Sequence, residues 1–92
     1  MKVSFTGRHA FDVDRVSIAI QVKVDGIDSR VILPIEYLQD NFGLRCSTAP
    51  EAIRAYEANE GFILGIAQRI VDSLVTWPED FILTSELMAE YS

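Results

Sequence analysis

The 92-residue chain is 49% hydrophobic and 24% charged, which is enough for one hydrophobic core and too little for two, so we expect one domain over residues 1–92. It carries a net charge of −6, and residues 72–92 hold five of its 14 acidic residues and none of its eight Lys and Arg residues. This composition argues against a membrane span, because no apolar run approaches the roughly 18 residues required. It also makes nucleic-acid binding unlikely, because an acidic surface repels phosphates.

Two strands joined by a tight turn are expected at residues 16–33. From Val16 to Val24 apolar and polar side chains alternate, which is the period of a half-buried strand, and the alternation resumes at Ile27. Asp25-Gly26 suits a two-residue type I′ turn, because glycine accepts the positive φ that this turn requires. The pairs that follow from this turn are Val24–Ile27, Lys23–Asp28, Gln21–Arg30, Ile20–Val31 and Ile18–Leu33. A three-residue loop with a glycine bulge is the alternative, and it would shift every pair by one residue.

Helices are predicted over residues 34–42, ending at Gly43, and over residues 48–74. In the second region Thr48 and Glu51 have the spacing of a capping box. A single helix of about 25 residues would be roughly 37 Å long and would overhang a domain of this size. We therefore expect two helices, separated near residues 59–61.

Shorter elements are predicted at both ends of the chain. Residues 2–6 form a short strand in this interpretation, followed by a loop over residues 6–14. Near the C-terminus we expect a short strand at residues 81–84 and a last helical turn from Ser85. This order predicts an α+β fold, with an antiparallel sheet of three or four strands and two or three helices packed on one face.

The sequence contains no recognisable constellation of catalytic or metal-binding residues. His9 is the only histidine, and its spacing to Asp12 and Asp14 matches no established metal site. Asp12 and Arg15 are expected to form a solvated ion pair. Cys46, the single cysteine, is expected to be inert and suits a reducing compartment. We therefore predict no enzyme, no cofactor and no metal.

A candidate interaction surface lies on the outer face of the helix that follows residue 60. Gly61 and Gly65 fall opposite the apolar stripe, on the same side as Arg69, and Phe62 borders them. An exposed helical glycine costs about 1 kcal/mol relative to alanine, so the pair indicates either tolerated weakness or close approach of another backbone, within the monomer or across a dimer. Phe62 is either exposed or packed against the C-terminal segment, and Trp77 is either a core residue or a partner contact. The candidate interaction residues are Phe62, Gly65, Arg69 and Trp77.

Nearly the whole chain resembles the small bacterial proteins of the family called domain of unknown function 1488. The resemblance runs through FTGRHAFDVDRVSIAIQVKVDGIDSRVILPIEYLQDNFG, PEAIRAYEANEGFILGIAQRIVD and FILT. The matching residues are Phe11-Asp12 for the aromatic-Asp pair, Gly26 for the turn, Leu38 for the first helix, and Ala55, Tyr56 and Asn59 for the later helical region. Pro34 departs from the pattern, since many relatives carry a polar helix cap there. The resemblance implies a small α+β fold and a bacterial cytoplasmic protein, and it implies no activity.

These observations predict a small cytoplasmic protein that acts as a non-catalytic protein-interaction module, binding an unidentified protein or a second copy of itself. A small-ligand site between sheet and helices, with Arg15 or Arg45 as the anion anchor, is one alternative. A regulator that contacts nucleic acid is the other. The hairpin at residues 16–33 is expected mainly to build the sheet, with function on the helices or the C-terminal segment.

Overall fold

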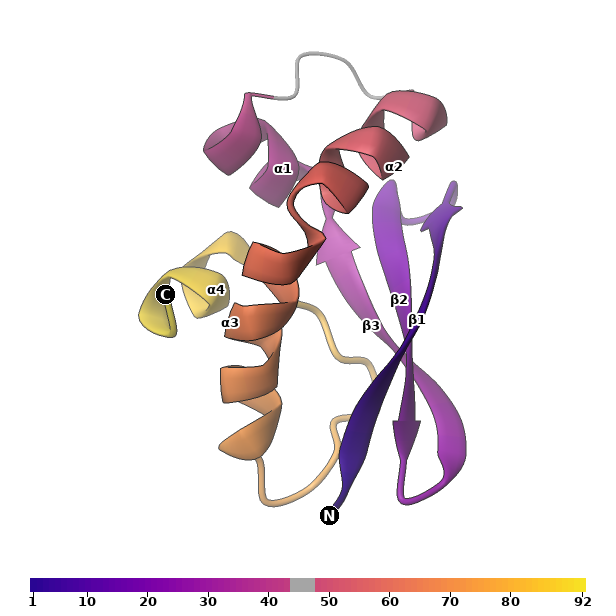
Figure 1. Ribbon diagram of the computed structural model, residues 1–92, viewed down its shortest axis with the longest axis vertical. Helices are drawn as coiled ribbons and strands as arrows, with labels where there is room; N and C mark the ends of the chain where they lie inside the picture. The colour runs from indigo at the N-terminus through magenta and orange to yellow at the C-terminus, as the bar shows by residue number, and fades with distance from the viewer. Residues whose placement is uncertain (44–47) are drawn as a thin grey trace.

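The computed structural model describes residues 1–43 and 48–92, and it consists of one sheet with helices on one of its faces (Figure 1). The elements in chain order are β1 (Val3–Asp12), β2 (Ser17–Val24), β3 (Ile27–Pro34), α1 (Ile35–Phe42), α2 (Ala49–Ala58), α3 (Glu60–Asp72) and α4 (Ser85–Glu90). The sheet is antiparallel in the order β1-β2-β3. This confirms the predicted α+β class. The described residues form four helices rather than two or three, because the expected last turn extends to a six-residue helix.

The β2–β3 hairpin has the register predicted from its turn. Val24 pairs with Ile27 and Gln21 with Arg30, and the ladder continues without interruption to the end of both strands. Asp25 and Gly26 have φ angles of 52° and 83°, so both turn residues take the left-handed conformation that a type I′ turn needs. The hairpin therefore fixes which side chains face the helices and which face away.

Strand β1 is longer than the sequence pattern indicated, because residues 6–12 belong to it rather than to a loop. Its ladder with β2 is irregular between Phe5 and His9, where two extra residues are accommodated. Gly7 lies in this bulge with φ 87°. The Thr6 hydroxyl donates to the Gln21 carbonyl (3.4 Å) and accepts from the Arg8 amide (3.2 Å). The bulge breaks the simple alternation of apolar and polar residues, so this half of the strand has no strand pattern in the sequence.

The core lies between the sheet and the helices. The side chains at its centre are less than 1% exposed, and they include Ile18, Val22, Leu33, Tyr56, Ile63 and Met88. Apolar side chains alternate with polar ones along β2 and β3, so one face of the sheet contributes apolar side chains to this core. On α3 the apolar residues are spaced 3, 4 and 7 positions apart, so they form the facing apolar stripe. The opposite face of the sheet receives the hairpin's polar residues.

The helices begin and end largely as the sequence predicts. Gly43 follows α1 in the left-handed conformation (φ 69°), whereas Pro34 is the last residue of β3 and the N-cap of α1 rather than a residue of its first turn. Thr48 is the N-cap of α2 but makes no side-chain cap hydrogen bond, so that half of the expected capping box is wrong. The helical region divides at Asn59, as two helices, and Gly61 lies inside α3. The Asn59 side chain donates to the Ala55 carbonyl (2.8 Å).

The segment between α3 and α4 closes the outer edge of β3 with a single bridge instead of a strand. The Ile32 amide donates to the Phe81 carbonyl (2.8 Å), and the Leu83 amide donates to the Ile32 carbonyl (2.7 Å). These two bonds define one parallel bridge between Ile32 and Ile82, and the expected strand at residues 81–84 does not extend beyond it. Among the described residues, no helix combines the length and apolar character needed to cross a membrane.

Candidate interaction surface

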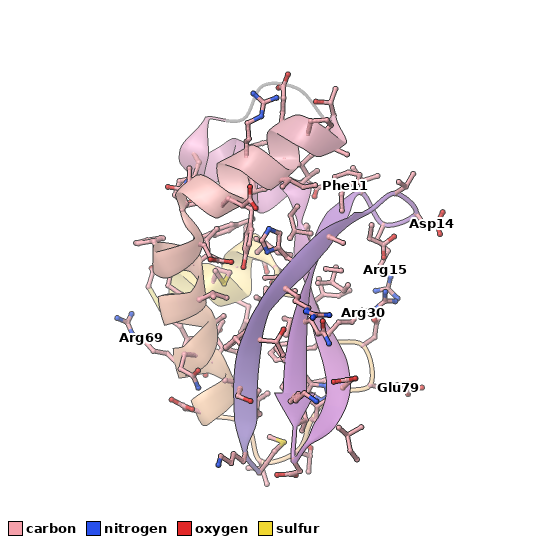
Figure 2. The ribbon with its side chains drawn as sticks, turned by 45° about the vertical axis from the view of Figure 1, so that its right-hand side comes forward. Phe11, Asp14, Arg15, Arg30, Arg69 and Glu79 are labelled. Carbon is pink, nitrogen blue, oxygen red and sulfur yellow. The ribbon has the colours of Figure 1, made fainter. Side chains whose placement is uncertain are left out.

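The face of the sheet that points away from the helices is open, and basic side chains gather on it. Figure 2 shows Arg15 and Arg30 on the side of the sheet away from α3, whereas Arg69 projects from α3 on the opposite side. The residues of this open face include Arg8, Ala10, Asp12, Ala19, Gln21, Lys23, Asp28 and Arg30, and Ile32 lies on it beside Ala19. They include three of the chain's eight Lys and Arg residues, and Arg15 at the edge is a fourth.

A shallow hollow of about 450 Å³ spans all three strands on this face. Its floor is made by the small side chains of Ala10 on β1 and Ala19 on β2, which pair directly across the ladder. Arg8, Gln21 and Arg30 stand around this floor. Because the residues between them are so small, the polar groups of the long side chains can converge above the sheet.

The cations on the open face differ in how well they are paired. Lys23 Nζ lies 3.3 Å from Asp28 Oδ1, directly across the hairpin. Arg30 Nη1 is 3.8 Å from Asp12 Oδ2, which is a long ion pair, and its side chain is 58% exposed. Within residues 1–43 and 48–92, no ion pair joins the Arg8 guanidinium to an acidic residue. Arg8 and Arg30 therefore retain donors that a ligand can occupy.

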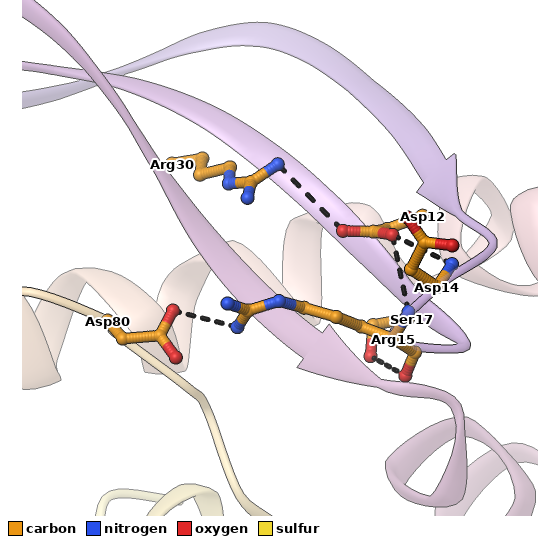
Figure 3. A network of polar contacts seen from close by, with 6 residues as sticks. All are labelled: Asp12, Asp14, Arg15, Ser17, Arg30 and Asp80. Carbon is orange, nitrogen blue, oxygen red and sulfur yellow. Dashed lines mark hydrogen bonds and ion pairs between the residues drawn. The ribbon is translucent and has the colours of Figure 1, made fainter.

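The turn between β1 and β2 holds Arg15 across the edge of this face (Figure 3). Asp12 Oδ1 accepts from the backbone amides of Asp14 (3.1 Å) and Arg15 (3.3 Å), while Arg15 Nη1 donates to Asp80 Oδ1 (2.7 Å). The hydrogen bond to Asp80, together with its charge, raises the pKa of Arg15. The predicted Asp12–Arg15 ion pair is thus wrong, because the two residues meet through the backbone and the guanidinium turns to the C-terminal segment.

His9 occupies the other face of β1, beside the break between α2 and α3. Its Nε2 lies 3.0 Å from Glu57 Oε2 and its Nδ1 lies 3.6 Å from Glu60 Oε2. The ring contacts Tyr56 with a centroid distance of 4.8 Å. Burial, followed by the charge of Glu60, raises the pKa of Tyr56. Asp12 faces the open side, so these two residues, weighed as metal ligands, lie on opposite faces of the sheet.

Three of the four residues predicted as an interaction surface lie together on α3. Phe62 is 58% exposed and meets Phe42 edge-on at a centroid distance of 6.0 Å. A Cβ built on Gly65 would meet nothing within 4 Å, so no backbone within the described monomer approaches it closely. Arg69 Nη1 donates to the Tyr91 carbonyl (2.9 Å) and so connects α3 to the end of α4.

Trp77, the fourth predicted residue, lies apart from the other three. Its indole N–H donates to Ser29 Oγ (3.0 Å), and its ring packs edge-on against Phe81 at a centroid distance of 5.1 Å. It is half-buried at the edge of the core beside β3. Arg45 and Cys46 lie outside the described residues.

Two of the three comparisons with known proteins return nothing: no family model matches the sequence, and neither does any curated protein. A solved structure does match, the crystal structure of a protein of unknown function from the DUF1488 family of Shewanella loihica PV-4. The two structures superpose with a TM-score of 0.75 over 89% of this chain and 92% of that one, at 15% sequence identity. The chain has the fold of that DUF1488 protein. The resemblance noted in the sequence is thus matched in three dimensions.

The sequence pattern gave only part of the open-face site. The hairpin register already places Gln21 beside Arg30, although the sequence predicts that this hairpin mainly builds the sheet. The sequence pattern predicts a loop over residues 6–14, so it does not place Arg8 beside this pair, whereas the structure has Arg8 in β1. One pattern in the sequence could have indicated this site. The small residues Ala10 and Ala19 lie between the long side chains of Arg8 and Arg30, which leaves room for a hollow.

Proposed function

We propose that this protein is a non-catalytic module that binds another protein through the open face of its sheet. The observation that carries the proposal is the hollow between the exposed residues Arg8 and Arg30, which stand over a floor of alanines. Arg8 makes no ion pair among the described residues, and Arg30 makes only a long one with Asp12 (3.8 Å). Arginine is enriched at protein interfaces because its planar group makes several directed hydrogen bonds. The similarity to the DUF1488 protein concerns the fold and carries no activity with it.

The shape of the hollow favours a macromolecular partner over a substrate. It is shallow and lies on an uncovered sheet face, so a bound group would keep one side in water. Enzyme sites and small-molecule sites more often enclose most of the ligand surface. A protein partner can cover the hollow and its rim together, which excludes water from the arginine contacts and strengthens them.

The test is recovery of the tagged chain from its native host after nuclease treatment, with identification of bound proteins by mass spectrometry. Three variants are compared with the wild type: Arg8→Glu with Arg30→Glu on the open face, Phe62→Asp on α3, and Arg54→Glu as a matched control on an exposed face of α2. We expect a nuclease-resistant partner that is lost only in the open-face variant. A partner lost only in the α3 variant, or none at all, would overturn the proposal.

A small anionic ligand is the second candidate, because the same hollow has a volume within the range of small-molecule sites. A screen of carboxylates and phosphates by thermal shift separates the two. A ligand that binds the hollow stabilises the folded state by RT ln(1 + L/Kd), where L is the free ligand concentration, so the melting temperature rises with the logarithm of the ligand concentration above its Kd. Stabilisation of the wild type but not of the Arg8→Glu, Arg30→Glu variant would favour this candidate.

A further inference from the structure

The polar residues around the hollow form a row that crosses the three strands. Gln21 on β2 is the direct partner of Arg30 on β3. Arg8 on β1 belongs to the bulge that lies opposite Gln21, and Thr6 and Arg8 are held there by hydrogen bonds to one another and to the Gln21 carbonyl. Neighbouring strands are about 4.8 Å apart, so the backbones of Arg8 and Arg30 are separated by roughly 10 Å.

The two arginines in this row can bind two anionic groups. Arg8 has no acidic partner within the described residues, and Arg30 reaches only Asp12 at 3.8 Å. Asp28, the acidic residue in the lining of the hollow, is already paired with Lys23 at 3.3 Å. Carboxylates bind guanidinium groups through two parallel hydrogen bonds, which are stronger than bonds between neutral groups. The row thus offers two guanidinium forks with an amide between them.

We propose that the hollow binds an acidic segment of the partner protein, with one carboxylate on Arg8, a second on Arg30 and the Gln21 amide between them. This rests on the proposed function and names the chemistry of its partner. In an extended segment, residues two apart lie on the same side at about 7 Å, a distance that two arginine side chains leaning inward can span. The preferred pattern is therefore two acidic residues separated by one other residue.

A nucleic acid is a poorer occupant of the same row. Proteins that bind single strands stack bases on aromatic side chains, and the open face of this sheet has none among its described residues. Binding to a duplex requires many Lys and Arg contacts with phosphates, whereas this chain has a net charge of −6. Carboxylates carried on a protein segment need only the two arginines.

The experiment measures binding of fluorescent ten-residue peptides to the 92-residue chain by anisotropy. One peptide carries a Glu-Ser-Glu centre in a Gly/Ser background, one carries Gln-Ser-Gln and one carries Lys-Ser-Lys. We expect only the acidic peptide to bind. Affinity should fall at least about tenfold in Arg8→Gln and in Arg30→Gln, and less than about twofold in the exposed control Arg54→Gln. It should also fall at 0.5 M salt, where exposed charges are screened.

The outcomes separate this inference from the function on which it rests. If the partner from the native host is lost in the open-face variant while no acidic peptide binds, the interaction module stands and the acidic segment is wrong. Equal binding of the Gln-Ser-Gln peptide would also overturn the acidic chemistry. Binding of a single-stranded oligonucleotide that the same two substitutions abolish would replace the segment with a nucleic acid.

Discussion

The two faces of the sheet treat neighbouring polar residues in opposite ways. Arg8 and His9 are adjacent in β1, yet Arg8 lies on the open face with no acidic partner among residues 1–43 and 48–92, whereas His9 is mostly buried between two glutamates and the Tyr56 ring. The open face keeps its donors available to another molecule, and the covered face uses its polar groups to join β1 to α2 and α3. Changes on the open face should therefore alter binding, and changes on the covered face should alter stability.

The outer face of α3 adds a third case, in which exposure does not mean availability. Arg69 is exposed, but its guanidinium already donates to the Tyr91 carbonyl. This hydrogen bond gives Arg69 a structural role within the monomer, whereas the guanidinium of Arg8 makes no ion pair with the described residues. A charged residue is thus a better candidate for partner binding when its hydrogen bonds are unused than when it is merely accessible.

The largest expected effect is on the covered face, from Tyr56→Ala. Tyr56 is fully buried, and removing a large aromatic side chain from a core costs about 3–5 kcal/mol in the free energy of unfolding. Urea denaturation measures this cost, and peptide binding at low temperature measures any effect on the open face. Weaker peptide binding by the folded fraction would show that the two faces are coupled, and it would contradict the separation of binding from stability.

Reversal of one charge on the open face, Arg8→Glu, should have the converse effect. We expect peptide binding to fall by more than about tenfold, while the midpoint of urea denaturation stays the same, because Arg8 makes no ion pair with the described residues. A clear loss of stability in this variant would mean that Arg8 has a structural role instead.

Gly65→Leu tests the surface predicted on α3. The position is open, so the new side chain should be tolerated, and the gain in helix propensity should raise the free energy of unfolding by about 0.5–1 kcal/mol. We expect partner binding to persist. If size-exclusion chromatography with light scattering shows a wild-type dimer that this variant dissociates, α3 is a contact surface after all.

Alkaline pH should destabilise the covered face through Tyr56. Burial raises the pKa of this tyrosine, so its neutral form is favoured in the folded state while the unfolded chain ionises near pH 10. The resulting stability is fully present below about pH 10 and is lost as the pH rises towards the folded value. Between pH 8 and 11, the melting temperature of Tyr56→Phe should fall less steeply with pH than that of the wild type. Some pH dependence should remain, because burial also raises the pKa of Tyr37. Parallel curves would show that Tyr56 is not responsible.

The smallest effect is expected at the turn beside Arg15. Val16 has φ 48°, a left-handed conformation that a β-branched residue rarely adopts. Val16→Asn should relieve this strain and raise the free energy of unfolding by about 0.5–1 kcal/mol, without altering peptide binding. Lower stability would indicate that the partly exposed valine contributes more by packing than it loses by strain.

The sequence predicted those parts of the fold that depend on local chemistry. The hairpin register followed from Asp25-Gly26, and the end of α1 followed from Gly43, because both rest on glycine accepting positive φ. The second half of β1 was missed because the bulge interrupts its alternation. The strand expected at residues 81–84 is a single bridge, since apolar residues buried against the core follow the same pattern whether or not a ladder forms.

The candidate site was harder to predict than the fold, because it joins residues from three strands. The local pattern gave the Gln21–Arg30 pair, but whether Arg8 stands beside it depends on two residues inserted in another strand. Which arginines and lysines form ion pairs within the monomer also depends on the three-dimensional structure. Arg15, weighed as an anion anchor, instead pairs with Asp80 across a long sequence separation.

The single bridge at Ile32 has a consequence for how copies of the protein behave at high concentration. An unpaired outer strand is a template for joining sheets of different molecules edge to edge. The residues around Ile82 occupy the backbone groups of β3 at this point, and Trp77 is bonded to Ser29 farther along the same strand. On the other side of the sheet, the bulge in β1 disturbs the straight edge that a second sheet would need. The fold therefore limits polymerisation at both edges while leaving the open face of the sheet uncovered by helices.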